Sequence, residues 1–289
     1  MQKAINFSSF DGTMLNGVLA SPDEGAPRGG VLLLHGSPSE KNEGGFHSDA
    51  PEPEAKYKKL GGMVEYLTVS GFMSLRFDYR EQGDNHKTPN MENLSVSGMI
   101  SDSESGYHVL RSNLGTDAPI FVVGTSFAGG LAVKWLVSYN RTISYLFLMA
   151  PLLDFSSTIR KTDVIERDAL GMERLTATAV ANLNRDGFLV SGGKKMSREF
   201  LNEVMMMNLE EDFKRLSCKS LIFHGTIDPI VPYQTSAAFV GLSHGMSELI
   251  PVEAAVHGFG QEGDLEWETD QTRLNHETIY QKMIARMVE

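Results

Sequence analysis

Short apolar runs recur along the chain, and each ends in a loop signal such as Gly, Asp or Pro. Nearly continuous apolar runs are typical of strands that are buried on both faces, as in a parallel sheet. The runs lie at residues 31–34, 73–77, 120–123, 143–149, 221–223 and 249–252. Two further strands are expected before them, because the first twenty residues alternate around Asp11-Gly12, a turn signal typical of a β-hairpin.

Stretches with helical spacing separate these runs. They cover residues 55–69, 96–114, 127–139, 233–242 and 272–288. Gly61 and Gly62 weaken the first of them by about 1 kcal/mol each relative to alanine. Alternating strands and helices predict an α/β doubly wound fold with a mostly parallel, eight-stranded sheet flanked by helices. In such folds the ligand site lies where the carboxyl ends of the strands converge.

Residues 155–215 interrupt this alternation, because helix-like runs such as 199–209 dominate there. We interpret this stretch as a helical cap inserted into a core formed by residues 1–154 and 216–289. Met205-Met206-Met207 favours adaptable packing, with the lining of an acyl pocket as the alternative. Gly192-Gly193 is a candidate hinge, although glycine alone is a weak signal for one.

Composition and charge exclude several functional classes. The 289 residues are 41% hydrophobic, enough for one large globular core. A net charge of −11 argues against a nucleic-acid surface. We expect no membrane span and no signal peptide, because apolar segments of the required length are missing. With Cys218 as the single cysteine, these features predict a reduced, soluble, cytoplasmic protein. The spacing of its eight histidines matches no metal motif, and we expect no cofactor.

The strongest chemical signal is the segment FVVGTSFAGG at residues 121–130. An apolar strand ends in a tight turn with Ser126 at its apex, and a helical pattern follows. This is the strand–turn–helix context of the Gly-x-Ser-x-Gly nucleophile motif, in which the turn requires small neighbours. Gly124 satisfies that requirement, and Ala128 stands where glycine is usual. The Lys-Ser/Thr pair of a phosphate-binding loop does not follow Gly129-Gly130.

A serine nucleophile needs a general base, which in turn is oriented by a carboxylate. Asp228 follows the apolar run 221–223 directly, and His257 comes after the last predicted strand. Both therefore lie at the edge where Ser126 is expected. Asp154 is an alternative acid and His244 an alternative base, but His244 precedes the last strand instead of following it.

With these motifs in this order, the chain resembles members of the α/β-hydrolase superfamily over nearly its whole length. The resemblance implies a catalytic triad of Ser126, Asp228 and His257. It also implies an oxyanion hole built from the segment after the third strand, HGSP at residues 35–38, for which Ser37 is the candidate because proline has no N–H. The second donor would be the backbone N–H of Phe127.

The segment RFDYREQGD at residues 76–84 resembles the Asp-x-Arg-Gly-x-Gly-x-Ser loop common in this superfamily. It departs from that loop at Glu81, where glycine is usual, and at Asp84, where serine is usual. We interpret the segment as structural, with Arg80 in a scaffold ion pair instead of a substrate clamp.

Within the superfamily three functions compete. The first is a serine carboxylesterase acting on small-molecule esters through an acyl-enzyme, which resembles the cytoplasmic cinnamoyl or feruloyl esterases. The second is an acyl thioesterase or acyltransferase that resembles the bacterial acyltransferases of bioluminescence. Phe188 and Phe200 would then accept an acyl chain. A partner such as an acidic acyl carrier protein would need a basic patch, and Lys194, Lys195 and Arg198 are candidates. The third is a binding protein without turnover, against which the intact triad order argues.

Overall fold

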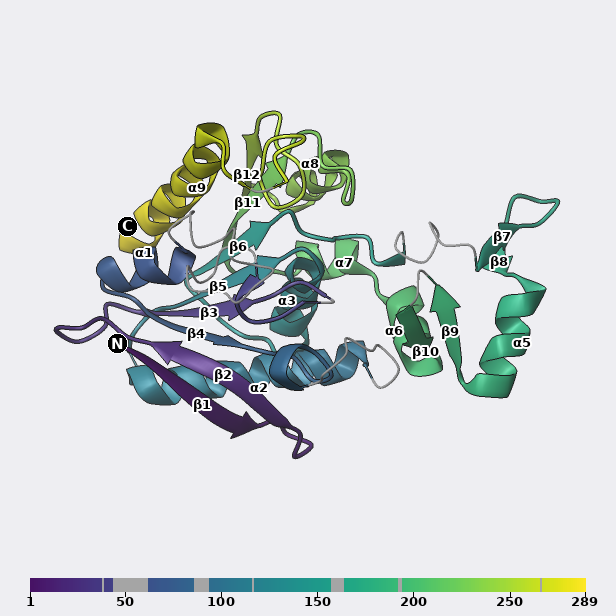
Figure 1. Cartoon of the computed structure of the whole chain (residues 1–289), viewed down its shortest axis with the longest axis horizontal. Coiled ribbons are helices and arrows are strands. Elements are labelled where there is room, and N and C mark those ends of the chain that lie inside the picture. Colours follow the sequence, from purple (N-terminus) through teal and green to yellow (C-terminus); the bar gives the residue numbers. More distant parts are fainter. Residues whose placement is uncertain are drawn as a thin grey trace.

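In the computed structural model, eight strands form one central sheet (Figure 1). The structure describes residues 1–37, 39–43, 62–85, 94–115, 117–156, 164–191, 194–265 and 267–289. The strands of the central sheet are β1 (Gln2–Ser8), β2 (Met14–Ala20), β3 (Gly30–Leu34), β4 (Met73–Phe77), β5 (Ile120–Thr125), β6 (Tyr145–Met149), β11 (Lys219–Gly225) and β12 (Ser247–Val252). Their spatial order is β1-β2-β4-β3-β5-β6-β11-β12.

All pairings from β4 to β12 are parallel, whereas β2 runs antiparallel to both of its neighbours. β1 and β2 form the expected hairpin, in which Ser8 pairs with Met14 across the Asp11-Gly12 turn. The predicted mostly parallel sheet of eight strands is therefore confirmed.

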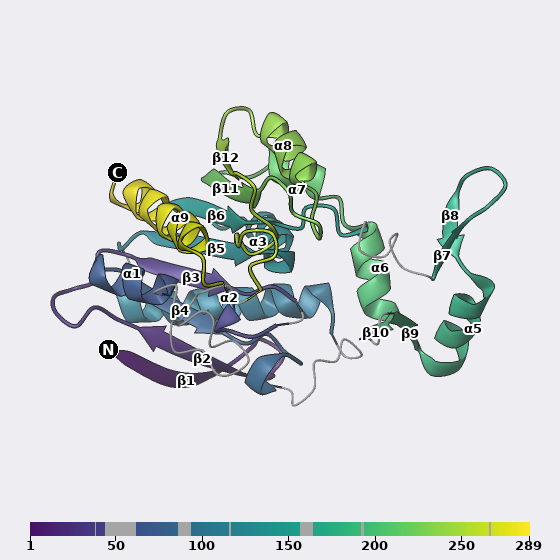
Figure 2. The same ribbon diagram turned by 45° about the horizontal axis from the view of Figure 1, so that its top comes forward.

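Helices cover both faces of this sheet (Figures 1 and 2). One apolar core lies under α1 (Met63–Val69) and α9 (Asp270–Val288). The other lies under α2 (Val96–Leu114), α3 (Phe127–Ser138) and α8 (Tyr233–Leu242). Within the described ranges, no helix is both long and apolar enough to cross a membrane. The helix predicted from residue 55 is seen only as α1, because residues 44–61 lie outside the described part of the chain.

The segment between β6 and β11 differs from the expected helical insertion. It contains α5 (Ala177–Asp186), α6 (Arg198–Met206) and α7 (Leu209–Lys214). It also contains two small hairpins, which the helical prediction missed. Their strands are β7 (Ile165–Arg167), β8 (Glu173–Leu175), β9 (Phe188–Ser191) and β10 (Lys194–Ser197). Strands of three or four residues are too short to leave a periodic pattern in the sequence. The candidate hinge Gly192-Gly193 lies outside the described residues.

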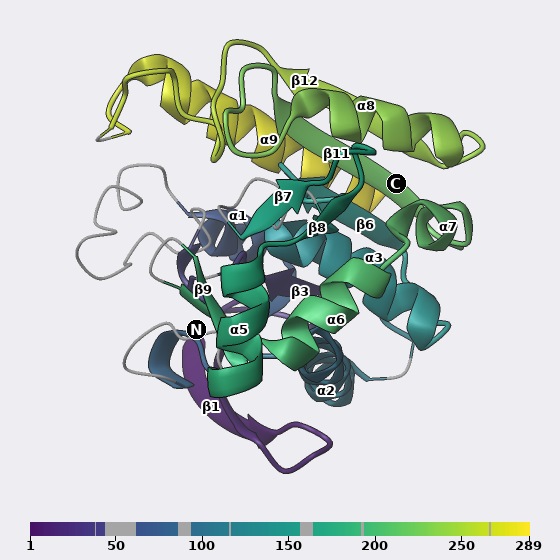
Figure 3. The same ribbon diagram turned by 90° about the vertical axis from the view of Figure 1, so that its right-hand side faces the viewer.

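We call the part from β7 to α6 the arm, because β7, β8 and α5 lie far from the central sheet in two views (Figures 1 and 2). Figure 3 shows the arm from its outer side. α7 packs instead on the core, since Phe213 meets Phe239 of α8 edge to face and Asp212 forms an ion pair with Lys134 of α3.

The inner end of the arm, α6, is attached to the core by a ring stack and by hydrogen bonds. Phe200 stacks on Phe127, with ring centroids 6.1 Å apart. The carboxylate of Glu203 accepts hydrogen bonds from the backbone N–H groups of Val96 and Ser97, at 2.5 and 3.2 Å. A carboxylate at the amino end of a helix satisfies N–H groups that have no partner within the helix. α6 is therefore tied both to the helix that follows Ser126 and to α2.

Candidate active site

Ser126 lies at the sharp turn between β5 and α3, and its backbone has φ 50° and ψ −118°. This left-handed region is costly for a residue with a side chain and persists only where the surroundings enforce it. Here the Ser126 N–H donates to the carbonyl of Met149, and the Ser126 carbonyl accepts from the N–H groups of Gly129 and Leu152. The turn is thus fixed by the end of β6 and by the loop that follows it.

Close approach of the backbone explains the small residues around Ser126. A Cβ atom on Gly124 would lie 2.8 Å from the carbonyl oxygen of Ala128. A Cβ atom on Gly129 would lie 2.5 Å from the Cβ of Pro151. Ala128 itself is fully buried, so its methyl group fits where glycine is usual.

Three predicted site residues come together in one chain of hydrogen bonds. The Nε2 of His257 lies 3.0 Å from the hydroxyl oxygen of Ser126, and its Nδ1 lies 2.7 Å from Oδ2 of Asp228. A ring nitrogen that faces a carboxylate carries the proton, so Nε2 is left to accept the serine hydroxyl proton. The Asp228 side chain is fully buried, whereas that of His257 is 22% exposed.

The carboxylate of Asp228 is held by its own loop. Its Oδ1 accepts from the backbone N–H groups of Ile230 and Val231, at 2.8 and 2.9 Å. Burial alone raises the pKa of a carboxyl group, but hydrogen bonds from His224 and His257 outweigh burial here. They hold the pKa of Asp228 well below its usual range, so that this side chain is ionised at neutral pH.

Neither alternative residue reaches this chain of hydrogen bonds. Asp154 lies past the end of β6, where its Oδ1 accepts from the hydroxyl of Ser156 at 2.6 Å. His244 is exposed in the turn between α8 and β12, before the last strand. The structure thus places Asp228, and not Asp154, against the ring of His257.

Of the two expected oxyanion donors, Phe127 directly follows Ser126 and Ser37 belongs to a loop that approaches it. Phe127 is the first residue of α3, so its N–H has no acceptor within the helix. The loop after β3 passes close to the nucleophile, because a Cβ atom on Gly36 would lie 3.3 Å from the Cβ of Ser126. Ser37 follows in this loop and is half-buried. Pro38 lies outside the described residues.

The Ser37 loop is fixed by contacts that no sequence motif marks. The Nδ1 of His35 donates to the carbonyl of Gly36, and its Nε2 accepts from the N–H of Tyr79. The amide of Gln82 donates to the Ser37 hydroxyl at 2.9 Å. Burial lowers the pKa of His35 to about 4, which keeps this ring neutral. The loop after β3 is therefore anchored to the loop after β4.

A second buried histidine fixes the loop that carries His257. The Nε2 of His276, in α9, lies 3.0 Å from the carbonyl oxygen of Gly258. Burial lowers the pKa of His276 to about 4. The amide of Asn275 donates to the carbonyl of Phe259 at 2.9 Å. Gly258 has φ 89°, and a Cβ atom there would strike the ring of Trp267. No motif marks these positions, because the partners come together only through the packing of α9.

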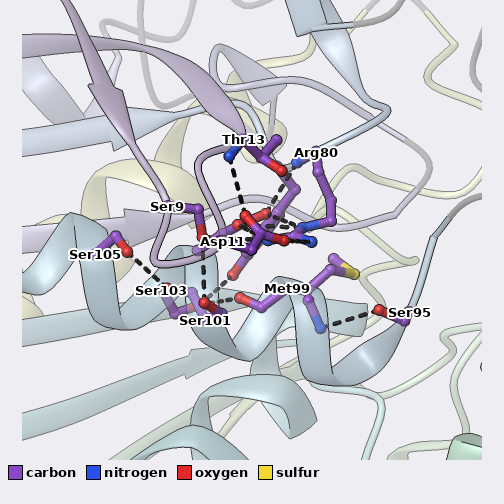
Figure 4. A network of polar contacts seen from close by, with 12 residues as sticks. Ser9, Asp11, Thr13, Arg80, Ser95, Met99, Ser101, Ser103 and Ser105 are labelled. Carbon is purple, nitrogen blue, oxygen red and sulfur yellow. Dashed lines mark hydrogen bonds and ion pairs between the residues drawn. The ribbon is translucent and has the colours of Figure 1, made fainter.

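Arg80 is engaged with the scaffold (Figure 4). Its guanidinium binds the buried carboxylate of Asp102 and also that of Asp11, in each case at 2.6 Å. These contacts join the N-terminal hairpin to α2. They agree with the interpretation of Arg80 as part of a scaffold ion pair.

The expectation for the methionine cluster of the insertion changes in part. Met205 and Met206 are exposed, so packing is the wrong interpretation for these two, whereas Met207 packs against the core. Met207 also lines a cavity of about 420 Å³. The remaining walls come from the loop after β6, the start of α7 and α8, and include Leu153, Asp154, Phe155, Gln234 and Phe239.

The candidate basic patch is occupied by contacts within the arm. The Nζ of Lys195 lies 4.4 Å from the ring centroid of Phe188, and Arg198 donates to the carbonyl of Leu183 at 2.9 Å. The side chain of Lys194 lies outside the description. In the described ranges, no group of three His, Cys, Asp or Glu side chains is placed to hold a metal ion.

Comparison with known proteins adds a family match. The family described as serine aminopeptidase, S33, matches residues 55–264. The lysophosphatidylserine lipase ABHD12 of Macaca fascicularis is 26% identical over 209 residues, which cover 71% of this chain and 42% of that lipase. The corresponding lipase of Bos taurus matches with the same identity and coverage. The chain therefore spans less than half the length of these relatives.

Solved structures match over nearly the full chain. Est1E from Butyrivibrio proteoclasticus with bound ferulic acid has a TM-score of 0.71 at 18% identity, covering 99% of this chain and 100% of that one. An esterase from Exiguobacterium antarcticum has a TM-score of 0.62 at 15% identity, with 99% and 100% covered. At such identities the likeness establishes a shared fold.

Proposed function

Because the chain belongs to the serine aminopeptidase, S33, family and has the α/β-hydrolase fold, we propose that this hydrolase cleaves carboxylic esters with Ser126 as the nucleophile. The observation that carries the proposal is the hydrogen-bond chain from Ser126 through His257 to Asp228. In this chain the Nε2 of His257 faces the Ser126 hydroxyl as an acceptor, and the carboxylate of Asp228 is ionised. Acyl transfer requires both.

Acylation follows from this geometry. His257 takes the hydroxyl proton as the Ser126 oxygen forms a bond to the ester carbonyl carbon. The tetrahedral intermediate collapses with cleavage of the bond to the alkoxy oxygen, and His257 returns the proton to the departing alcohol. Asp228 keeps the imidazole oriented and stabilises its cationic form. Water then attacks the acyl-enzyme by the same steps and releases the acid.

The developing negative charge needs donors on the other side of the carbonyl. The backbone N–H groups of Ser37 and Phe127 fill this role in the proposal, since the Ser37 loop passes beside the Ser126 side chain. Losing one such donor typically lowers kcat by about 10²–10³-fold. The anchoring of the loop by His35 and Gln82 keeps its donor in place before substrate binds.

We propose a small-molecule ester as the substrate and residues 155–215 as a cap over the site. The arm supports this role, because Phe200 packs directly on Phe127 beside the nucleophile. The structural neighbour that binds ferulic acid and the lipase relatives both favour an ester. Lys195 and Arg198 are already engaged within the arm, so these two charges do not favour an acyl carrier protein.

A fluorophosphonate probe tests the nucleophile directly. The wild-type enzyme is expected to become labelled, and Ser126→Ala is expected to stay unlabelled. The matched control is Ser156→Ala, which changes a serine that contacts Asp154 and should label like the wild type. Equal labelling of the wild type and Ser126→Ala would show that another residue is the nucleophile.

A substrate panel tests the bond that is cleaved. p-Nitrophenyl esters of short, long and aromatic acids are compared with acyl thioesters and with aminoacyl p-nitroanilides. The last group is included because the family is described as one of aminopeptidases. We expect esters to lead by at least about tenfold in kcat/KM, which is about 1.4 kcal/mol of transition-state binding. Leading activity on the anilides or thioesters would overturn the ester assignment.

A further inference from the structure

A second imidazole contacts the carboxylate that orients His257. His224 lies in β11, four residues before Asp228, and its side chain is fully buried. Its Nε2 lies 2.9 Å from the carbonyl oxygen of Val231 and 3.3 Å from Oδ2 of Asp228. Both neighbours are acceptors, so Nε2 must carry a proton that the two oxygens share.

The other ring nitrogen of His224 faces a hydroxyl group. Its Nδ1 lies 2.7 Å from the hydroxyl oxygen of Ser236 in α8, which is fully buried. A hydroxyl can donate or accept, so this contact allows Nδ1 to remain unprotonated while Ser236 donates. The contacts thus direct the Nε2–H of His224 toward the carbonyl of Val231 and the carboxylate of Asp228.

We propose that His224 is a positioning residue of the hydrolytic reaction: its Nε2–H donates to the same Asp228 oxygen that holds His257. This inference rests on the proposed function, in which Asp228 orients His257. Oδ1 is held by two backbone N–H groups, so His224 completes the restraint by fixing Oδ2. The carboxylate plane is then set before the serine reacts.

The contact also sets how strongly Asp228 stabilises the protonated ring of His257. A donor on Oδ2 neutralises part of its charge, and the low pKa of Asp228 agrees with donation from both histidines. Without His224, more of that charge acts on His257 and favours its protonated form. The acidic limb of the kcat/KM profile should then move to higher pH.

The effect can be assigned to this contact because few titratable groups face it in the described part of the chain. Asp228 and His257 belong to the site itself. Tyr233, at the start of α8, meets the His224 ring edge to face at 5.9 Å. Glu253 lies farther along the same edge, with its carboxylate 3.5 Å from the Thr226 hydroxyl.

Two substitutions separate donation from packing. His224→Leu removes the donor, whereas His224→Gln keeps an N–H group that reaches the same oxygens. We expect His224→Leu to lower kcat/KM by about 10–100-fold and to raise the midpoint of the acidic limb by about half a pH unit. His224→Gln should recover most of the rate and restore the midpoint. His244→Gln, at the exposed turn after α8, is the control and should match the wild type.

The proposal is wrong if the Leu and Gln variants lose the same activity while both keep the wild-type midpoint, because His224 would then act through packing alone. Should both fail to fold, ¹⁵N NMR of the unaltered enzyme decides. The ring signals of His224 are assigned by their change in Ser236→Ala. They must show a proton on Nε2 near pH 7, and the Nε2 signal must shift in Asp228→Asn. A proton on Nδ1, or an unshifted signal, would overturn it. The NMR test needs no turnover, so its failure can be told apart from a failure of the proposed function, which the labelling of Ser126 tests.

Discussion

The loops at the carboxyl edge of the sheet and the arm are held in opposite ways. Each loop of the candidate active site is fixed by a contact of a buried histidine: His35 of the Ser37 loop accepts from the N–H of Tyr79, His224 of β11 contacts Asp228, and His276 of α9 contacts the carbonyl of Gly258. The anchors of the arm to the core lie at its inner end, where Phe200 stacks on Phe127, Glu203 accepts from α2 and Ser197 donates to the carbonyl of Leu94. Its outer part exposes Leu170 and Met172, at 87% and 64%.

The difference follows from what each region has to do. Acyl transfer requires reacting atoms that are already aligned. A buried hydrogen bond that holds them contributes about 0.5–1.5 kcal/mol to stability, or about 1.5–3 kcal/mol where one partner is charged, as at Asp228. Contact with substrates of varied shape, the role proposed for the arm, does not need such restraint. We therefore expect substitutions at the edge loops to cost far more than substitutions of the same size in the arm.

The largest effect is expected at the acid. Asp228→Asn keeps the shape of the side chain but lets the amide favour the wrong ring tautomer of His257. We expect kcat to fall by about 10⁴-fold. Asp154→Asn is the matched control and should change kcat by less than about tenfold. Steady-state kinetics on the best ester checks this, and a larger loss in Asp154→Asn would reassign the acid.

The second-largest effect is expected at the backbone of the turn that carries Ser126. Gly129→Ala brings a Cβ atom to 2.5 Å from the Cβ of Pro151, so we expect a loss of about 2–4 kcal/mol in the free energy of unfolding. Gly241→Ala in α8 meets nothing within 4 Å and should gain up to about 1 kcal/mol through helix propensity. Urea denaturation measures both. An unchanged free energy of unfolding in Gly129→Ala would mean that the turn at Ser126 is less restrained than the contacts indicate.

The buried histidines make the edge loops sensitive to acid. An unfolded histidine has a pKa near 6.5, whereas burial lowers the pKa of His35 and His276 to about 4. Between these values the unfolded chain binds more protons, so stability falls as the pH falls from about 6.5 toward 4. At pH 5 each ring costs about 2 kcal/mol relative to pH 7.

Substituting one ring isolates its share of this pH dependence. Urea unfolding of His276→Gln at pH 7 and pH 5 should show a loss about 2 kcal/mol smaller than that of the wild type. His244→Gln should keep the wild-type loss. An unchanged loss in His276→Gln would contradict a neutral, buried His276.

The smallest effects are expected in the arm. Glu203→Gln weakens the contact with the amino end of α2 and should lower the free energy of unfolding by about 1 kcal/mol. Leu170→Ser changes a side chain that is largely in solvent and should stay within about 0.5 kcal/mol of the wild type. A cost above that for Leu170→Ser would show that the outer arm is held more firmly than its exposure indicates.

Local signals account for what could be predicted from sequence. The limits of α2 and α8 agree with the helical patterns at 96–114 and 233–242. Ser95 caps α2 through the N–H of Gly98, and Pro232 precedes α8. The places of Ser126, Asp228 and His257 also follow local rules, because each lies within five residues after the end of a strand.

The missed features depend on contacts between distant parts of the chain. His276 lies 18 residues from Gly258, and Gln82 lies 45 residues from Ser37. Neither pair has a spacing that a helix or strand pattern would mark. The hairpins of the arm were missed for a different reason, since their strands have only three or four residues and lack an extended buried face.

The attachment of the arm through α6 has a consequence for protein engineering. We expect a library that varies the edge loops to consist largely of misfolded or inactive members, since each loop depends on buried contacts that few substitutions preserve. We expect a library confined to the outer arm, with Phe200 and Glu203 kept, to retain folded enzymes while it changes residues of the proposed cap. Under the cap role proposed for the arm, substrate range and catalytic competence would lie in separate, independently mutable stretches of this chain.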